Sequence, residues 1–447
     1  MNTLSEKMIG VTRKRSDLVG RSNKERSLKI AIYHNLEAGG AKRYLFDVLR
    51  SLKRKGYKID LYTLRGKKDN VLSLDGFVDQ SFVYDFKDIK HFSFPIYSVE
   101  QLIAFIRFVA LIFRLEKISK RMAADIDRKN YDLVYIHHCH YAQTPLIIRF
   151  LKTRKLYCWH EGWRWSYEKG SSRIPEHLNS ISFSSFLIHT CEALRGWFLK
   201  RLDRLNTIAA DRITSNSYFS RETLQRLHGL SSDVVYPGID VDKFKPNGQK
   251  RENFVFAPGR FEKNKGYHWI IKALGKIEKS KRPKLVMGGF MSEYYKKEVK
   301  ALQDMAKEKE VMLEFVSLKD EELIAHYQKA LCTVYLPYLE PFGLIPLESM
   351  ACGTPVIGIR EGGVRETVID GEVGFLVGRD EDQVSAAISN LLENRELRER
   401  MGLASRKYSI ENWNVNKRME DVDALIRNLV FVQKNAPNKS SNGSPSL

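Results

Sequence analysis

The stretch that decides the fold runs Val334-Tyr-Leu-Pro-Tyr-Leu-Glu-Pro-Phe-Gly-Leu-Ile-Pro-Leu-Glu-Ser-Met-Ala-Cys-Gly-Thr-Pro-Val-Ile-Gly358. Its pattern predicts a buried strand over 332–336, a turn containing Pro341 and Gly343, a helix over 345–352 and a second buried strand. Pro346 is compatible with the helix because it falls in the first turn, where its missing N–H has no intrahelical partner. The stretch therefore indicates a strand–helix–strand unit of an α/β sheet.

Two carboxylates of this unit are candidates for binding a ligand. Glu340 follows the first strand, and Glu348 lies inside the helix, roughly 7–8 Å along its axis. Ligands of open parallel sheets bind at the carboxyl ends of strands, beside helix N-termini. Both carboxylates, and the N–H groups of Phe342, Gly343 and Leu344, can therefore face one cleft, where carboxylates would accept hydrogen bonds from sugar or ribose hydroxyls. The alternative is a glutamate that interacts with the helix dipole and another that is simply exposed.

The same residues resemble a known signature. Glu340 and Glu348, with the Ser-Met-Ala-Cys-Gly-Thr-Pro-Val-Ile run that follows, are similar to the Glu-x7-Glu motif of the retaining glycosyltransferases of family 4. The resemblance implies the GT-B fold, in which two Rossmann-like, doubly wound α/β domains face a cleft and a C-terminal helix crosses back to the N-terminal domain. It covers roughly residues 28–430. It is firm in the second domain and loose in the first, where 64–130 and 163–205 match no part of the family pattern.

Length and composition set broad limits. The 447 residues are enough for two or three domains, and the net charge of +20 favours anionic partners such as nucleotide diphosphates, anionic membrane surfaces or nucleic acid. The five cysteines are widely spaced, which argues against a disulfide framework and for a reducing, cytoplasmic compartment. Residues 1–26 do not read as a signal peptide, and no window is apolar enough to predict a transmembrane helix.

The expected divisions follow the changes in pattern and the resemblance together. They are a flexible basic N-terminus over 1–26, an acceptor-binding domain over 27–245, a domain for a nucleotide sugar over 246–410, a crossover helix over 411–432 and a disordered tail over 433–447. The polar segment 246–253 marks the boundary between the two domains.

The first half begins with a βαβ pattern. A strand over 28–33, a loop ending in Gly39-Gly40, a helix over 41–53 and a strand over 59–63 are predicted. Paired glycines let backbone N–H groups approach an anion at a helix N-terminus, although an ordinary tight turn explains them equally well. The resemblance implies that Gly39 and Gly40 meet the donor phosphate.

Histidines follow two further strands of the first half. The run His137-His138-Cys139-His140 invites a metal interpretation, but consecutive residues of an extended chain point apart, so a loop that lines the cleft is favoured. His160 ends the strand over 155–160. The resemblance implies that it faces the transferred sugar, and the alternative is a histidine at the edge of the core.

A basic loop opens the second half. Arg260 and Lys265 follow a strand over 254–258, where a guanidinium fork and an ammonium can clamp a diphosphate. The alternative is a solvated basic loop. The Gly-Arg-x4-Lys-Gly pattern resembles the pyrophosphate clamp of the family, with Lys263 as a less favoured alternative to Lys265.

Two other motifs have weaker functional interpretations. Asp240 and Asp242 spell the Asp-x-Asp motif that binds metal and nucleotide in another glycosyltransferase fold, but their place between the domains favours turn and capping chemistry. Gly362 and Gly363 lie in a glycine loop that, by resemblance, is near the donor.

Two apolar, basic segments remain outside these motifs. Residues 92–121 and 182–202 are rich in aromatic side chains and carry scattered cations. One interpretation is helices buried against the sheet. The other is helices that dock on a membrane or hold a lipid tail, with long cationic side chains reaching the interface. The second suggests a lipid-linked acceptor and peripheral contact with the cytoplasmic face of a membrane.

Together these observations predict an enzyme of the hexosyltransferase class. It would move a hexose-type sugar from a nucleotide-diphosphate donor to a lipid-linked or saccharide acceptor, with retention, by a metal-independent same-face displacement. The resemblance implies that Glu348 holds the ribose, Glu340 and His160 contact the sugar, and Arg260 and Lys265 stabilise the leaving diphosphate. No cofactor, metal site or nucleic-acid partner is expected. The alternatives are a sugar-nucleotide epimerase on the same fold and a non-enzymatic protein that binds anionic polymers.

Overall fold

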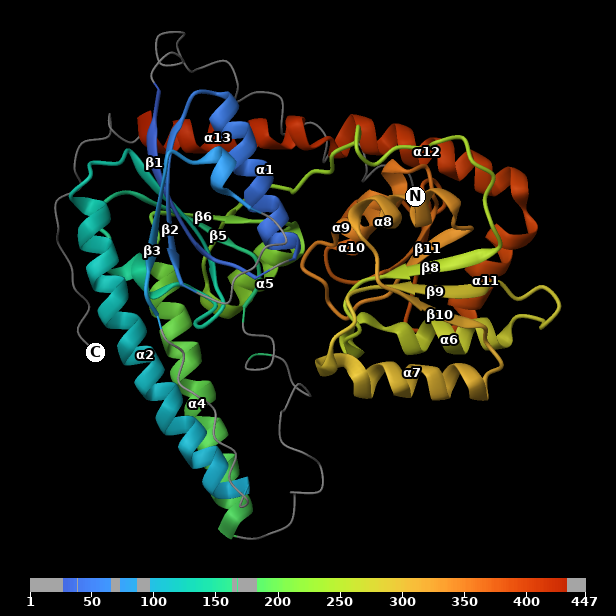
Figure 1. Ribbon diagram of the computed structural model, residues 1–447, viewed down its shortest axis with the longest axis horizontal. Coiled ribbons are helices and arrows are strands. Elements are labelled where there is room, and N and C mark those ends of the chain that lie inside the picture. The colour runs from blue at the N-terminus through green and yellow to red at the C-terminus, as the bar shows by residue number, and fades with distance from the viewer. Residues whose placement is uncertain are drawn as a thin grey trace.

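The structure is a computed structural model that describes residues 27–37, 39–65, 73–86, 97–162, 167 and 183–431. The side chains of 97–101, 183–185 and 187 are not described. The predicted N-terminus over 1–26, the tail over 433–447 and the start of the apolar segment at 92–96 lie outside these residues. Within them the chain forms two parallel sheets with helices, lying side by side (Figure 1). This is the predicted α/β architecture.

The first sheet has seven strands in the order β3-β2-β1-β4-β5-β6-β7, and every pairing is parallel. Parallel neighbours require crossover connections, and α-helices form several of those described here. The strands are β1 (Lys29–Asn35), β2 (Lys58–Leu64), β3 (Gln80–Tyr84), β4 (Leu133–Cys139), β5 (Lys155–Trp159), β6 (Arg212–Ser215) and β7 (Asp233–Val234). The helices are α1 (Gly40–Arg54), α2 (Tyr97–Asp127), α4 (Phe183–Ile208) and α5 (Tyr218–His228).

The second sheet has six parallel strands in the order β10-β9-β8-β11-β12-β13. Its strands are β8 (Phe254–Pro258), β9 (Lys284–Gly288), β10 (Leu313–Val316), β11 (Cys332–Tyr335), β12 (Val356–Ile359) and β13 (Gly374–Val377). Its helices are α6 (Tyr267–Lys276), α7 (Lys296–Glu308), α8 (Asp320–Lys329), α9 (Leu344–Ala351), α10 (Val364–Thr367), α11 (Glu381–Glu393) and α12 (Arg395–Trp413).

The last described helix returns to the first sheet. Helix α13 (Val415–Phe431) follows α12 after a single residue, and the two run along one side of the molecule from the second sheet to the first (Figure 1). Its buried side chains, Met419, Val422 and Ile426 among them, join the core formed by β1, β2 and α1. Asp423 accepts a hydrogen bond from the Lys55 ammonium at 2.9 Å, which fixes α13 beside the end of α1. The predicted crossover is confirmed.

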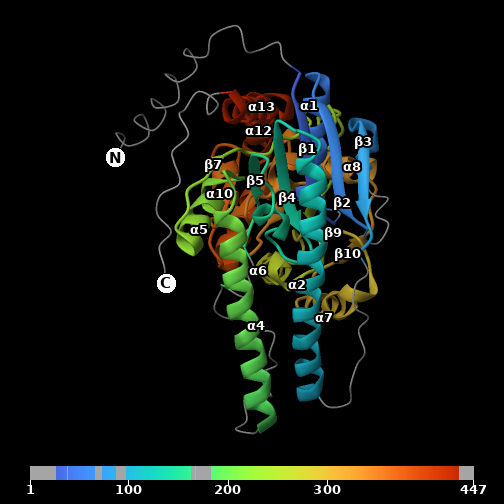
Figure 2. The ribbon, with the colours of Figure 1, turned by 90° about the vertical axis from the view of Figure 1, so that its left-hand side faces the viewer.

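The long helices α2 and α4 differ from a purely buried arrangement. Their halves near the sheet contribute buried residues such as Leu115 and Met122, whereas their other halves project side by side beyond the sheet (Figures 1 and 2). They pack on each other there, with the Phe108 and Phe198 rings 6.0 Å apart at 89°. The prediction of helices buried against the sheet therefore holds for the halves near the sheet, and contact with a membrane stays a prediction for the projecting halves.

The N-terminus of α5 differs in detail from the sequence-based prediction. The sequence pattern predicts a helix over 221–227 with Ser220 as its N-cap. In the structure the helix begins at Tyr218 and its N-cap is Ser217. The Ser217 hydroxyl accepts a hydrogen bond from the Ser220 backbone N–H at 2.9 Å. The error arises because both serines are good N-caps, and only the position of the first turn distinguishes them.

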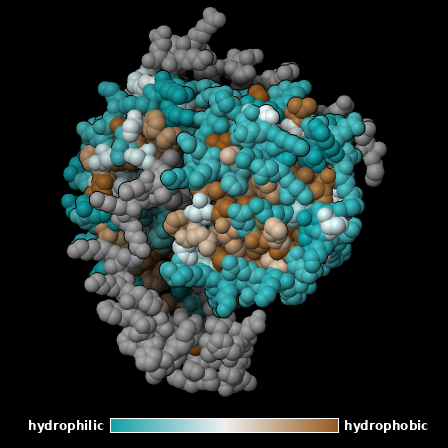
Figure 3. Space-filling model, turned by 45° about the vertical axis from the view of Figure 1, so that its right-hand side comes forward, coloured by the Kyte–Doolittle hydropathy of each residue, from teal (hydrophilic) through white to brown (hydrophobic). Residues whose placement is uncertain are grey.

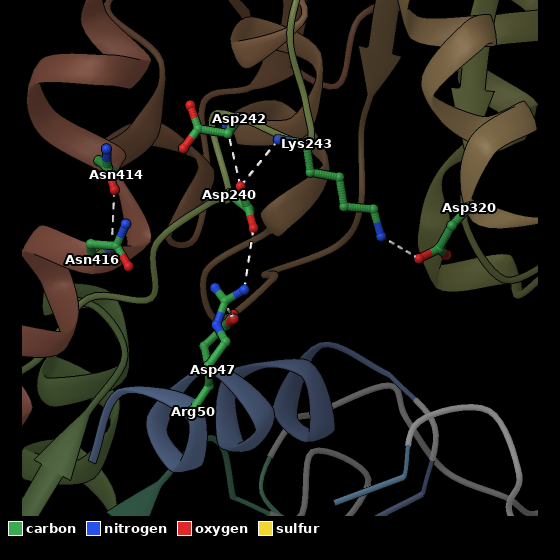
Figure 4. Close-up of polar contacts among 8 residues, drawn as sticks. All are labelled: Asp47, Arg50, Asp240, Asp242, Lys243, Asp320, Asn414 and Asn416. Carbon is green, nitrogen blue, oxygen red and sulfur yellow. Dashed lines mark hydrogen bonds and ion pairs between the residues drawn. The ribbon is translucent and has the colours of Figure 1, made fainter. Parts of the chain in front are cut away.

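Polar contacts connect α1 with the segment between the two sheets (Figure 4). The Arg50 guanidinium donates to Asp240 at 3.3 Å and to Asp47 at 3.1 Å. Asp240 also accepts hydrogen bonds from the backbone N–H groups of Asp242, at 3.2 Å, and Lys243, at 3.1 Å. The aspartate therefore has the turn and capping role that was favoured over a metal role.

The molecular surface is mainly hydrophilic on the face shown in Figure 3, and hydrophobic residues gather in one central area of that face. Exposed large hydrophobic side chains of the second half include Phe290, Tyr294 and Met312. Apolar atoms make up a large part of the surface of folded proteins in general, so exposed side chains of this kind do not by themselves mark a site.

Candidate functional site

Glu340 lies in the turn between β11 and α9, where two glycine loops meet. Gly343 is the N-cap of α9 with φ +91°, a conformation that side-chain-bearing residues rarely adopt. The N–H of Gly363 donates to the carbonyl of Glu340 at 2.8 Å. A Cβ atom on Gly362 would lie 2.4 Å from that same carbonyl oxygen. The loop over 361–363 therefore packs directly on the turn that carries Glu340.

The structure brings Lys265 and Glu340 together from segments 75 residues apart. The Lys265 ammonium donates to Oε2 of Glu340 at 2.9 Å, and both side chains are partly buried. The close approach depends on Gly266, which has φ +74° and whose added Cβ would lie 2.1 Å from the carbonyl oxygen of Leu336. Only glycine lets the basic loop lie this close to the end of β11.

The other cation of the loop has a more open position. Arg260 follows β8, and its exposed guanidinium lies 3.5 Å from Glu262. Glu340 and Glu161 also contribute to the electrostatic field at Arg260. Lys263 lies in the short turn over 263–265 that precedes Gly266. Arg260 and Lys265 therefore present positive charge on the side of the site that carries Glu340.

Glu348 is buried and has two partners. Its Oε1 accepts a short hydrogen bond from the Arg43 guanidinium, and its Oε2 accepts one from the Tyr327 hydroxyl at 2.7 Å. Burial, with Glu348 beside it, raises the pKa of Tyr327 well above its ordinary value, so the hydroxyl stays a donor. Arg43 comes from α1, on the first sheet. The carboxylate expected to face the cleft openly is thus held between the two halves of the chain.

Sequence reasoning did not identify Arg43 or Tyr327. Arg43 gave one usable signal, since a cation in the first turn of a helix is unfavourable beside the positive end of the helix dipole. Such a residue implies a compensating partner, which here is Glu348. Tyr327 lies on α8 and gave no signal, because an aromatic residue on the buried side of a helix ordinarily belongs to the core.

Gly39 and Gly40, at the start of α1, lie close to the start of α9. Gly39 has φ +157° and precedes α1, and its carbonyl accepts from the N–H of Arg43 at 3.0 Å. A Cβ added at Gly40 would lie 3.6 Å from Cδ1 of Leu344. The first turn of α1 therefore lies against the first turn of α9. The N–H groups at both helix starts lack intrahelical partners and suit an anion.

His160 follows β5 and belongs to a buried cluster. Burial lowers the pKa of His160 to about 4, so its imidazole is neutral at physiological pH. Its Nε2 lies 3.6 Å from Sγ of Cys158, and its ring centroid lies 5.8 Å from that of His137. His140, at the end of the same run, points to a different partner: its Nδ1 lies 3.2 Å from Oε1 of Glu37.

A small cavity of about 30 Å³ lies where the two halves meet, lined by the residues on either side of His160 in the chain. Trp159, Glu161 and Phe219 line it from the first half, and Leu339 and Pro341 line it from the turn that carries Glu340. The cavity thus connects the neighbourhood of His160 with that of Glu340, and its walls combine aromatic and charged side chains.

Two family profiles match the chain in succession. One is described as "Glycosyltransferase Family 4" and matches residues 38–243, and the other is described as "Glycosyl transferases group 1" and matches residues 239–408. The boundary between the two matches falls at the Asp240 segment, and together they cover the two sheets.

Curated relatives share part of the chain. The human alpha-1,3/1,6-mannosyltransferase ALG2 is 29% identical over 269 residues, which are 52% of this chain and 64% of the relative. The GDP-mannose-dependent alpha-(1-6)-phosphatidylinositol monomannoside mannosyltransferase of Mycolicibacterium smegmatis is 30% identical over 46% of this chain and 59% of its own length. The chain therefore matches less than two thirds of the length of each.

Solved structures show the same fold over nearly the whole chain. Sucrose-phosphate synthase of Thermosynechococcus elongatus superposes with a TM-score of 0.70 at 20% identity, over 90% of this chain and 99% of that one. Anabaena HepE, solved in complex with UDP-glucose, superposes with a TM-score of 0.60 at 17% identity, over 89% and 99%. At these identities the likeness establishes the fold alone.

Proposed function

The chain belongs to the group 1 glycosyltransferases of family 4, and from that premise we propose that it is a retaining hexosyltransferase. The donor is a nucleotide-diphosphate sugar bound between α1, the 260–266 loop and the start of α9. The acceptor is lipid-linked or a saccharide, and the enzyme works at the cytoplasmic face of a membrane. No metal takes part in the transfer.

The contact between Lys265 and Glu340 is the observation that carries this proposal. A carboxylate and an ammonium held together in a glycine-lined turn match the two ends of an activated sugar, its hydroxyls and its diphosphate. In the complex Lys265 turns toward the diphosphate together with Arg260, and Glu340 accepts hydrogen bonds from hydroxyls of the sugar. The preorganised cations then stabilise the charge that develops on the leaving group.

The transfer step requires no protein nucleophile. Glu348 is buried and Glu340 is paired with a cation, so neither is placed as a free carboxylate for attack on C1. The acceptor oxygen forms its bond to C1 on the face from which the donor phosphate oxygen departs with the electron pair of the C1–O bond. The acceptor proton passes to that phosphate oxygen. The products are the glycosylated acceptor, with retained configuration, and the nucleoside diphosphate.

The ribose of the donor would use Glu348. A ribose hydroxyl takes the place of the Arg43 guanidinium as the hydrogen-bond donor to Oε1 of Glu348. The Tyr327 hydroxyl continues to donate to Oε2 and so holds the carboxylate in place. The neutral imidazole of His160 contacts the sugar from the opposite half. The acceptor approaches beside the small cavity lined by Trp159, Phe219 and Pro341, where aromatic faces and charged groups are both available.

The projecting parts of α2 and α4 support the lipid-linked acceptor. Ile106 and Phe113 are exposed and seven residues apart, so they share one helical face. Phe186 and Trp197 on α4 are exposed and eleven residues apart, which again places them on one face. Exposed cations accompany these aromatic residues, with Lys117 on α2 and Arg201 on α4. This combination suits an anionic lipid surface.

Within the described residues, no helix has the length and apolarity needed to cross a bilayer. The proposed contact is therefore one in which the two helices lie on or dip into the interface, with apolar side chains in the acyl boundary and cations at the headgroups.

The donor proposal is tested by transfer and hydrolysis assays over a panel of nucleotide sugars. GDP-mannose is the first candidate, because two of the relatives are named mannosyltransferases. Lys265→Ala should lower kcat/KM by about a hundredfold or more, the loss associated with one preorganised transition-state donor. Lys263→Ala, two residues away in the same turn, is the matched control and should retain activity. Equal activity of both variants would refute the assignment.

Two further assays separate the alternatives. Activity that is lost on chelation and restored by Mn²⁺ would contradict the metal-independent mechanism. Conversion of the nucleotide sugar to an epimer without any acceptor would identify an epimerase.

The membrane proposal is tested by co-sedimentation with vesicles that contain an anionic phospholipid. Phe113 and Trp197 are 68% and 61% exposed, and the control residue Leu403 on α12 is 76% exposed. Burying a large apolar side chain gains about 1.5–3 kcal/mol, so the double variant Phe113→Ser, Trp197→Ser should bind vesicles at least tenfold more weakly. Leu403→Ser should bind as the wild type does, and equal binding of all three proteins would overturn the proposal.

A further inference from the structure

Three side chains that can bind a metal meet on two adjacent strands of the first sheet. His137 is in β4, Cys158 is in β5 and His160 follows β5 directly. One ligand atom of each lies within 4.8 Å of the other two. The two strands pair in parallel with Ile136 opposite Tyr157, so the next position places His137 beside Cys158. The cluster thus depends on the strand register and not on the His137-His138-Cys139-His140 run.

The spacing and the ligand types suit zinc. Zn–N bonds are about 2.0–2.1 Å and Zn–S bonds about 2.3 Å, so nitrogen and sulfur ligands of a tetrahedral ion lie roughly 3.6 Å apart. Cys158 Sγ and His160 Nε2 are 3.6 Å apart. Two imidazoles and a thiolate form a mixed N/S set, which this ion accepts, and three protein ligands leave one position open.

The burial of His137 and its lack of hydrogen-bond partners are a second observation that points to a ligand. Its side chain is fully buried, and among the described residues neither ring nitrogen has a hydrogen-bond partner. The rings of Tyr135 and Tyr44 enclose it, with centroids 4.5 and 6.1 Å from its own. Leaving a buried polar group without a hydrogen-bond partner is unfavourable, so a bound ligand would stabilise this side chain. A cation bound at this cluster would be coordinated by one ring nitrogen of His137.

We infer that His137, Cys158 and His160 form a buried Zn²⁺ site with three protein ligands. On binding, the S–H bond of Cys158 breaks, a Zn–S bond forms and the proton passes to solvent. The inference amends the sequence-based expectation that the chain has no metal site. It extends the proposed function in one respect: a zinc ion that holds His160 removes the imidazole from the sugar, so occupation inhibits transfer.

The site is tested on the full chain with Co²⁺, a spectroscopic substitute for Zn²⁺. We expect one Co²⁺ per chain, with a thiolate-to-cobalt charge-transfer absorption that Zn²⁺ abolishes by displacement. Cys158→Ser should lose this absorption and bind Co²⁺ at least tenfold more weakly. Cys139→Ser, which alters another buried cysteine of the same sheet, should retain both. No thiolate absorption in the wild type, or unchanged absorption in Cys158→Ser, would overturn the inference.

A measurement on the wild type alone tests the site without relying on a variant that could misfold. X-ray absorption at the zinc edge of the zinc-loaded wild type should show two nitrogen neighbours at about 2.0–2.1 Å and one sulfur at about 2.3 Å. A shell of nitrogen and oxygen alone would mean an adventitious surface site and would also overturn the inference.

Inhibition is measured separately. One equivalent of Zn²⁺ should lower transfer by the wild type at least tenfold and leave transfer by Cys158→Ser unchanged. If zinc binds as described but the zinc-free enzyme transfers no sugar, the proposed function fails while the metal site stands.

Discussion

Replacing Arg43 by methionine tests the contact that connects the two halves of the chain at Glu348. The Glu348 side chain is 6% exposed and that of Arg43 is 31% exposed. Removing one partner of a fully buried ion pair costs about 3–5 kcal/mol. Solvent near Arg43 screens part of this attraction, and Glu348 keeps its hydrogen bond from Tyr327. We therefore expect Arg43→Met to lower the free energy of unfolding by about 2–3 kcal/mol.

Urea unfolding, followed by both tryptophan fluorescence and circular dichroism, measures this loss. Coincident transitions are needed before a single free energy is assigned to a chain with two sheets. The Glu348→Gln background provides a double-mutant cycle, because the neutral amide no longer needs a cation. In that background Arg43→Met should cost less than about 1 kcal/mol. Arg54→Met, which alters an exposed arginine at the end of the same helix, is the control and should change stability by less than about 0.5 kcal/mol.

The reasoning fails if Arg43→Met costs the same in both backgrounds. Equal costs would mean that the arginine acts through packing, for example on the Phe244 ring that lies 5.9 Å from its guanidinium carbon, and not through Glu348.

Two further perturbations follow from buried charge and from backbone geometry. Burial raises the pKa of Asp47 to about 6, so the folded state holds this proton more tightly than the unfolded state, and stability falls as pH rises from about 4 to about 6. Asp47→Asn should therefore stabilise the protein by about 1–3 kcal/mol in urea unfolding at pH 7.5 and give no gain at pH 4, and a gain of equal size at both pH values would contradict the assignment. Gly266→Ala places a Cβ 2.1 Å from the carbonyl oxygen of Leu336 at φ +74°, and it should lower stability by at least about 2 kcal/mol and reduce transfer. Gly371→Ala, at φ +78° with nothing within 4 Å, carries only the backbone strain, so a similar loss in both variants would contradict the steric argument.

Much of the fold was predictable because it depends on local pattern. The predicted strand over 332–336 is β11 (Cys332–Tyr335), and the predicted helix over 345–352 is α9 (Leu344–Ala351). Apolar runs, glycine and proline positions and helical spacing are properties of neighbouring residues, so they can be read from a single sequence. The predicted start of α5 was wrong because Ser217 and Ser220, three residues apart, satisfy the same capping rule.

The candidate site was predictable only in part. Glu340 and Lys265 were expected to converge, since strand-end loops of one sheet share an edge. The pairing of Glu348 with Arg43, 305 positions away, was not foreseen, and neither was the meeting of His137 with Cys158. In both instances the side chains come from segments whose sequences carry no information about each other.

By itself, the sequence determined the alternation of strands and helices, the two-domain organisation expected from it, and the residue types at each strand end. Only the tertiary structure decided which of those residues touch, how far α2 and α4 extend beyond the sheet, and how α1 and α9 face each other. The physical reason is that local propensity acts over one or two turns, whereas strand register and the apposition of two sheets are set by burial and pairing across the whole chain.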